Sequence, residues 1–67
     1  MKELKYEYSV YMDGGGMIEK GIMNEIRFHK IMYLLYKKSK AFENVVITEN
    51  IVFFRFMNEE YFIKKVR

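Results

Sequence analysis

Residues 4–12 alternate between apolar and polar side chains in the manner of a half-buried β-strand. One face is apolar and carries Leu4, Tyr6, Tyr8, Val10 and Met12. The segment 13–16, Asp-Gly-Gly-Gly, interrupts the pattern, and because glycine reaches positive φ without steric cost it predicts a turn. Residues 17–22 then fit the returning strand of a hairpin or the start of a helix. We favour the strand, because Gly21 would weaken a helix interior by about 1 kcal/mol.

Residues 24–40 have helical spacing. One stripe of the predicted helix consists of Phe28, Ile31, Met32, Leu35 and Ser39. Asn24 is a suitable N-cap, and Glu25 places negative charge in the first turn, where the helix dipole favours it. Lys37, Lys38 and Lys40 place positive charge at the other end.

Two runs of β-branched and aromatic residues, 45–48 and 51–57, flank the polar pair Glu49-Asn50 and predict a second hairpin. A polar break follows at 58–60, and residues 61–66 fit either a last strand or a short terminal helix. The pattern therefore predicts a single α+β domain over residues 1–67. Its antiparallel sheet would contain a β-hairpin and, after the helix, two or three further strands, with the helix packed on one face. The predicted core consists of Tyr8, Val10, Phe28, Ile31, Leu35 and Phe54.

Length and composition restrict how such a domain is stabilised. The chain has 67 residues, of which 51% are hydrophobic, with six Tyr, six Phe and no Pro or Cys. At this size, the free energy of burial and the conformational entropy lost on folding nearly cancel. The surplus must come from an unusually aromatic core, since each ring buries roughly 150–250 Å², or from a partner that covers more apolar surface.

The chain contains few residues that can perform catalysis. It has one His and one Asp, His29 and Asp13, and no Cys, so a nucleophile with its base or a full set of metal ligands is hard to assemble. Glu25 and His29 lie four apart on the helix, which suits two ligands but offers no third. The glycines at 14–16 lack the remainder of a phosphate-binding motif. We therefore predict a protein that is not an enzyme, with no cofactor, no metal and no small-molecule substrate indicated.

The hydrophobic runs are short. The longest of them, 31–36 and 51–54, fall far below the roughly 20 residues that span a bilayer, and the first residues do not resemble a secretory signal. The absence of Cys gives no evidence of an oxidising compartment. We expect a soluble cytoplasmic protein that does not bind membranes.

The run 51–57 is apolar on both faces. Val52, Phe54 and Phe56 alternate with a second set, Ile51, Phe53, Arg55 and Met57. One set must meet the helix, and the other needs a cover, supplied either by the chain itself or by a partner. Exposed apolar patches mark interaction sites, and aromatic residues, Met and Arg are enriched in them. The predicted partner-binding residues are Tyr11, Ile51, Phe53, Arg55 and Met57, with Phe53 as the anchor.

The outer face of the predicted helix is basic, and nine of the twelve Lys and Arg residues lie in 27–67, in a chain of net charge +3. Cations interleaved with an aromatic ring suit a phosphate backbone and stacked bases. The residues concerned are Arg27, Lys30, Tyr33, Lys37 and Lys38. The simpler interpretation is a solvated helix face whose last lysines interact with the helix dipole.

Taken together, the sequence predicts a small non-enzymatic protein-binding module, acting on a second copy or on another protein through an aromatic sheet face. The alternative is a nucleic-acid-binding domain. The abundance of Lys, Ile, Asn, Tyr, Phe and Met is typical of an AT-rich genome. A short chain without catalytic residues is compatible with an accessory protein of a phage or mobile element, such as an inhibitor of a host enzyme or an anti-defence protein.

Overall fold

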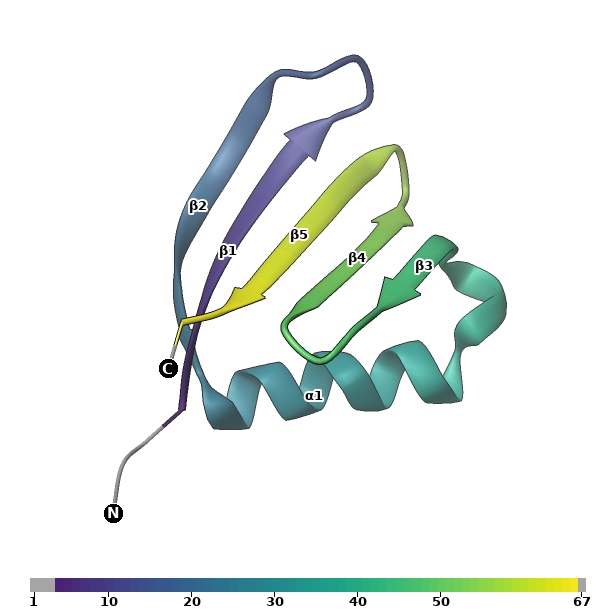
Figure 1. Ribbon diagram of the computed structural model, residues 1–67. Helices are drawn as coiled ribbons and strands as arrows, with labels where there is room; N and C mark the ends of the chain where they lie inside the picture. Colours follow the sequence, from purple (N-terminus) through teal and green to yellow (C-terminus); the bar gives the residue numbers. More distant parts are fainter. Residues whose placement is uncertain (1–3, 67) are drawn as a thin grey trace.

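The alternating segment near the N-terminus forms one half of a long hairpin (Figure 1). The computed structural model describes residues 4–66. In it, β1 (Lys5–Met12) pairs antiparallel with β2 (Met17–Asn24), and Gly14 and Gly15 take φ values of 107° and 110° in the turn. The strand interpretation of 17–22 is confirmed. Gly21 lies opposite Tyr8, and a Cβ at Gly21 would be 3.0 Å from the Tyr8 hydroxyl, so this position in the strand favours glycine.

The helix α1 (Glu25–Lys37) follows β2 without a loop. Asn24 is its N-cap as predicted, because the Asn24 side-chain oxygen accepts a hydrogen bond of 2.9 Å from the backbone N–H of Arg27. The predicted end at residue 40 is wrong. Lys38 leaves the helical conformation (φ −120°, ψ 47°), and the chain turns through a short 3₁₀ helix, η1 (Ser39–Ala41). This turn brings Phe42 against Phe54, with ring centroids 5.2 Å apart.

The C-terminal half is a three-stranded meander of β3 (Glu43–Ile47), β4 (Ile51–Phe56) and β5 (Glu59–Lys65). The last segment is thus a strand, and it pairs with β1. All neighbouring strands are antiparallel in the order β2-β1-β5-β4-β3, so the first and last strands of the chain lie in the middle of the sheet (Figure 1). The predicted α+β class is confirmed, with η1 as an element that the sequence did not indicate.

Three predicted boundaries in this half are wrong. The first run of the hairpin, predicted over 45–48, is β3 and spans Glu43–Ile47. The run 51–57 ends as a strand at Phe56, and Met57 and Asn58 form the β4–β5 turn with φ values of 50° and 65°. Positive φ at both central residues is the geometry of a tight hairpin turn, in which Asn is common and Met is unusual. The turn is therefore shorter and earlier than the polar break predicted at 58–60, and Glu59 and Glu60 belong to β5.

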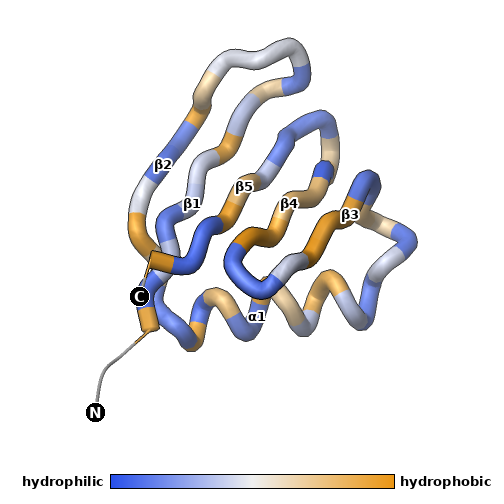
Figure 2. The backbone as a smooth tube through the Cα atoms, in the orientation of Figure 1, coloured by the Kyte–Doolittle hydropathy of each residue, from blue (hydrophilic) through white to orange (hydrophobic). Residues whose placement is uncertain are grey.

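The core lies between α1 and one face of the sheet. In Figure 1, the helix runs across the strands near one end, and the β1–β2 and β4–β5 turns project from the other end. Figure 2 shows hydrophobic stretches on the strands that alternate with hydrophilic positions. The buried hydrophobic side chains are Tyr6, Val10, Met23, Leu35, Val52, Phe54 and Ile63.

The predicted core is confirmed in part. Leu35, Phe54 and Val10 are buried, whereas Tyr8, Phe28 and Ile31 are half-buried around the same cluster. Phe28 stacks on Tyr6 with ring centroids 3.8 Å apart, which fastens the first turn of α1 to β1. Within residues 4–66, no helix has both the length and the apolar character needed to cross a membrane.

Candidate functional site

The face of the sheet opposite α1 carries two aromatic rings at its centre. Phe53 of β4 and Phe62 of β5 are directly opposed in the register, and their ring centroids are 6.5 Å apart in an edge-to-face arrangement. Their neighbours in sequence, Phe54 and Ile63, point to the core and are buried. Phe62 is 37% exposed and Phe53 is half-buried, whereas the helix α1 packs on the opposite face of the sheet with the buried cluster.

The aromatic pair continues toward the edge of the sheet. Val46 of β3 is paired with Phe53 and is half exposed. A bulge at Asn44, which has a φ of 54°, sets this register: it inserts one extra residue between the pairs Glu43–Arg55 and Val46–Phe53. We call this surface the uncovered face. Its apolar residues and Arg55 are Tyr11, Val46, Ile51, Phe53, Arg55 and Phe62, and polar residues, among them Ser9 and Glu60, lie beside them on the same face.

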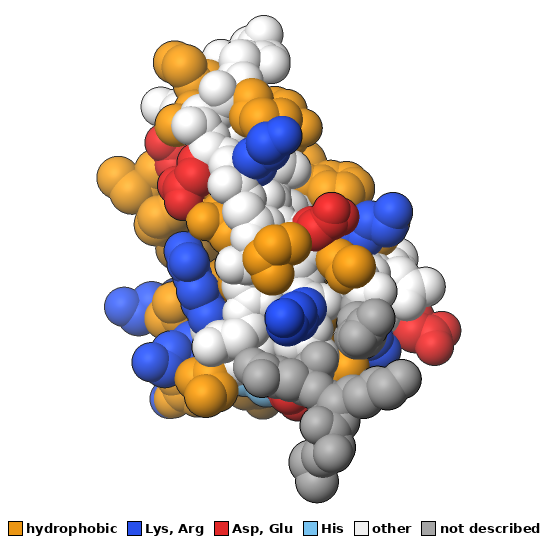
Figure 3. All heavy atoms as spheres, turned by 90° about the vertical axis from the view of Figure 1, so that its left-hand side faces the viewer, with side chains coloured by type: hydrophobic (Ala, Val, Ile, Leu, Met, Phe, Trp, Pro, Cys, Tyr) orange, Lys and Arg blue, Asp and Glu red, His pale blue; other side chains and the backbone are white. Residues whose placement is uncertain are grey.

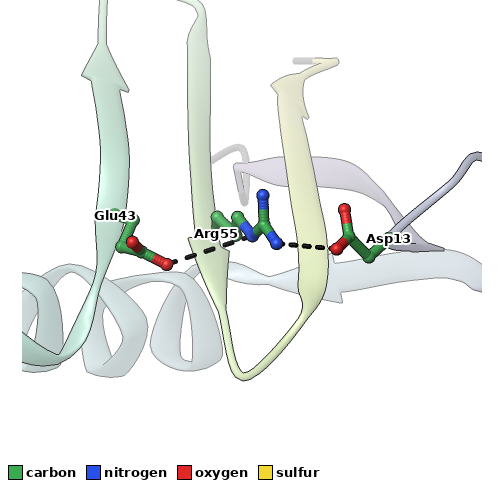
Figure 4. A network of polar contacts seen from close by, with 3 residues as sticks. All are labelled: Asp13, Glu43 and Arg55. Atoms are coloured by element: carbon green, nitrogen blue, oxygen red, sulfur yellow. Dashed lines mark hydrogen bonds and ion pairs between the residues drawn. The ribbon is translucent and has the colours of Figure 1, made fainter.

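Arg55 occupies one end of the uncovered face and is bound within the chain (Figure 4). One guanidinium nitrogen donates a hydrogen bond of 2.7 Å to Asp13 Oδ2, while Arg55 Nε lies 4.0 Å from Glu43 Oε1. Asp13 also donates its backbone N–H to the carbonyl of Asn58 at 3.0 Å. The network joins the β1–β2 turn to the C-terminal meander and holds Arg55 in a fixed orientation.

Four of the five residues predicted to bind a partner lie together on this face, and one does not. Tyr11, Ile51, Phe53 and Arg55 are half-buried on it. Met57 was expected to follow them by alternation, but the strand ends first, and its side chain, 77% exposed, lies in the β4–β5 turn.

The sequence interpretation missed Phe62 and Val46. The signal for Phe62 was the alternation of Tyr61, Phe62 and Ile63, which places Phe62 on the opposite face once this segment is taken as a strand. The signal for the bulge that aligns Val46 with Phe53 is Asn44, because Asn adopts positive φ more readily than most residues, but one Asn does not by itself predict a bulge.

The basic residues of the helix are all exposed: Arg27, Lys30, Lys37 and Lys38, together with Tyr33. They do not form one stripe. The guanidinium carbon of Arg27 lies 5.2 Å from the ring centroid of Tyr8, so Arg27 points toward β1 rather than outward. Lys38 is the C-cap and lies beyond the helix, which leaves Lys30, Tyr33 and Lys37 on the outer side.

On the helix side of the sheet, two tyrosines donate hydrogen bonds to carboxylates. The Tyr8 hydroxyl donates to Glu19 at 2.7 Å, and the Tyr61 hydroxyl donates to Glu59 at 2.8 Å. The hydrogen bond to Glu19 is the main cause that raises the pKa of Tyr8, whereas burial is the main cause that raises the pKa of Tyr61. Both phenols are therefore protonated donors at neutral pH.

These tyrosines border a hollow of about 180 Å³ between α1 and the strands β1, β2 and β5. Ligand pockets usually have volumes of roughly 300–1,000 Å³. The space is too small for most metabolites, and protonated phenols beside carboxylates do not supply a nucleophile.

The pair Glu25 and His29 has no further ligand close by. His29 Nε2 lies 3.7 Å from Glu25 Oε2, and both side chains are exposed to solvent. Within residues 4–66, no three His, Asp or Glu side chains are grouped so that they could hold a metal ion.

Comparisons with known proteins give no guide to function: no family model matches this chain, and no match is found among curated proteins or solved structures. The assignment of a function therefore depends on the surface of the molecule itself.

Proposed function

We propose that this protein is a protein-binding module whose contact surface is the uncovered face. The observation that supports this most is the position of Phe53 and Phe62, two large aromatic side chains opposed at the centre of the sheet on the side away from α1. A sheet with one solvated face normally carries polar residues at such central positions.

The energetics favour a cover over these rings. Burial of apolar surface contributes about 25 cal/mol per Å². Phe53 and Phe62 remain partly exposed next to Val46 and Ile51, so a partner that covered them would gain free energy from their burial. Rigid aromatic side chains also lose little entropy on binding, which is why they are common at the centres of interfaces. Phe62 also borders a hollow of about 450 Å³ beside Ile22 and Lys64, which a side chain of a partner would fill.

Arg55 strengthens the proposal because its guanidinium is fixed before any partner arrives. Its two carboxylate neighbours, Asp13 and Glu43, hold it beside the aromatic centre, so binding needs little additional ordering of this long side chain. A carboxylate or carbonyl of the partner close to Arg55 would give the contact orientation.

The partner is a second copy of the chain or another protein in the cytoplasm. An inhibitor or accessory protein, including one carried by a phage or mobile element, would bind another protein through the uncovered face. In both cases we expect association, but not folding, to require the uncovered face.

The test is light scattering coupled to size-exclusion chromatography over a range of protein concentrations and at two salt concentrations. We expect the wild type to associate, and Phe53→Asp and Phe62→Asp to be folded monomers. Met57→Asp is the matched control: it introduces the same charge at an exposed turn position, where Asp tolerates positive φ, and should associate like the wild type. A monomeric wild type together with an unfolded Phe53→Asp would refute the proposal, because Phe53 would then belong to the core.

The second candidate function is nucleic-acid binding through Arg27, Lys30, Tyr33, Lys37 and Lys38. The exposure of all five favours it. Lys30 and Lys37, which lie with Tyr33 on the outer side of α1, would contact about two phosphates and give a slope of roughly −2 for log affinity against log salt on duplex DNA. Tight, sequence-selective binding at physiological salt that is abolished by Lys30→Glu with Lys37→Glu would make this the leading function.

A further inference from the structure

The outer side of α1 carries large apolar side chains, although the helix already buries its inner side. Phe28, Ile31, Met32 and Leu35 face the core, whereas Ile26, Tyr33 and Leu34 are 67%, 59% and 45% exposed. A surface helix usually has one apolar stripe and a polar opposite face. A second stripe indicates a second surface to be covered.

The spacing of the outer residues is that of a coiled-coil seam. Ile26, Lys30, Tyr33 and Lys37 follow one another at intervals of four, three and four residues, so they lie in one line along α1. Ile26 and Tyr33 occupy equivalent positions one heptad apart, and Lys30 and Lys37 occupy the other pair. We call these four residues the outer seam. Ile26, Lys30 and Tyr33 also border a shallow open hollow on the helix surface.

The charges in the outer seam select between partners. A second copy would not satisfy the lysines: in a parallel arrangement Lys30 would face Lys30 and Lys37 would face Lys37, which is repulsive. In an antiparallel arrangement each lysine would face an apolar residue and would have no opposite charge beside it. A nucleic acid would satisfy the lysines but leave Ile26 and Leu34 against phosphates or sugar edges, since only Tyr33 can stack on a base. A helix with apolar residues opposite Ile26 and Tyr33 and carboxylates opposite the two lysines satisfies all four positions.

We propose that the outer seam of α1 is a docking site for an acidic amphipathic helix of another protein. Ile26 and Tyr33 provide the apolar contacts, and Lys30 and Lys37 form ion pairs with Asp or Glu of the partner. The seam lies on the opposite side of the molecule from the uncovered face, and the two surfaces can be occupied together. Figure 3 looks onto the β2 side of the molecule, where basic, acidic and hydrophobic side chains are interspersed.

The test uses two designed peptides of about 20 residues, long enough to populate a helix in solution. In the first, Leu residues are placed to meet Ile26 and Tyr33, and Glu residues are placed to meet the lysines. The second has Lys in place of those Glu residues. Affinity is measured by fluorescence anisotropy, and the contact is located by amide shifts in NMR spectra of the labelled protein.

We expect the Glu peptide to bind about tenfold or more tightly than the Lys peptide, with shifts concentrated in α1. Lys30→Glu with Lys37→Glu should reverse the preference. Lys64→Glu with Lys65→Glu on β5 makes the same change in net charge and should preserve it. Ile26→Ser, at an exposed position that does not contribute to the core, should weaken binding of the Glu peptide.

Three results would overturn the proposal. The first is equal affinity for both peptides or no binding of the Glu peptide. The second is a set of shifts outside α1. The third is a single-stranded oligonucleotide that competes with the Glu peptide and binds Ile26→Ser as well as wild type, because the seam would then recognise phosphates and not a helix.

Discussion

The two faces of β4 have the same kind of side chain and opposite roles. Phe54 points toward α1 and is 4% exposed, stacked on Tyr61 with ring centroids 4.9 Å apart and touched edge-on by Phe42. Phe53, one residue earlier, points to the other side and meets Phe62 alone among the aromatic rings. The covered face buries Phe54 among half-buried rings, whereas the uncovered face leaves Phe53 half-buried and Phe62 exposed.

This difference follows from the number of layers that 67 residues can build. One helix and five strands give a single sheet with one cover, so only one face can form a core. In β4, apolar residues occupy both faces, and on the uncovered face Ile51 and Phe53 remain only half-buried within residues 4–66. We propose that binding, rather than folding, accounts for the apolar character of the uncovered face.

The largest expected effect is on the covered face. Leu35→Ala removes the buried residue of α1 and should lower the free energy of unfolding by about 2–5 kcal/mol, enough to unfold much of a domain this small. Thermal unfolding followed by circular dichroism measures it. Lys38→Ala is the control, and equal midpoints for the two variants would show that the helix packs differently.

A smaller effect is expected at the end of the uncovered face. Asp13→Asn removes the charge paired with Arg55, and because the Asp13 side chain is 52% exposed, the loss should be at most about 1 kcal/mol. Urea unfolding at low and high salt measures it, and the difference from wild type should shrink at high salt. A loss that is unchanged in high salt would indicate that the hydrogen bond, not the charge, joins the two turns.

The smallest effect concerns pH. Burial and the hydrogen bond to Glu59 raise the pKa of Tyr61 above its ordinary value near 10, so the folded state holds this proton more tightly than the unfolded state. The stabilisation is complete below pH 10 and is lost as pH rises through the folded-state pKa. As pH rises above 10, the free energy of unfolding should therefore fall less in Tyr61→Phe than in wild type. Urea unfolding of both proteins from pH 8 to pH 11 measures this change. Parallel losses in the two proteins would contradict this.

Much of the fold was predictable because its signals are local. The alternation of residues 4–12, the glycine turn and the Asn24 cap each depend on a few neighbouring residues, and all three are confirmed. The end of α1 was missed because it depends on a distant contact: the chain must turn at Lys38 for Phe42 to reach Phe54. Lysines at 37–40 would have suited a longer helix equally well.

The residues of the candidate site were predictable where the alternation of β4 continued, and the prediction was wrong where the strand ended. Phe53 and Ile51 followed from the pattern of β4, but Met57 did not, because a two-residue turn with positive φ at Met57 is not indicated by its side chain. The intramolecular partners of Arg55 were also missed. Asp13 is 42 residues away in the chain, and only the central pairing of β1 with β5 brings the two together.

We propose that Phe53 belongs to the contact surface, whereas Phe54 belongs to the core. The most direct measurement is urea unfolding of Phe53→Asp and Phe54→Asp in dilute solution, where association does not contribute. We predict that Phe53→Asp unfolds cooperatively with a free energy within about 2 kcal/mol of wild type. Phe54→Asp should show no folded baseline, because it places a charge in the core. If both variants are unfolded, or if both remain folded, then Phe53 and Phe54 do not differ in their contribution to the core, which contradicts this proposal.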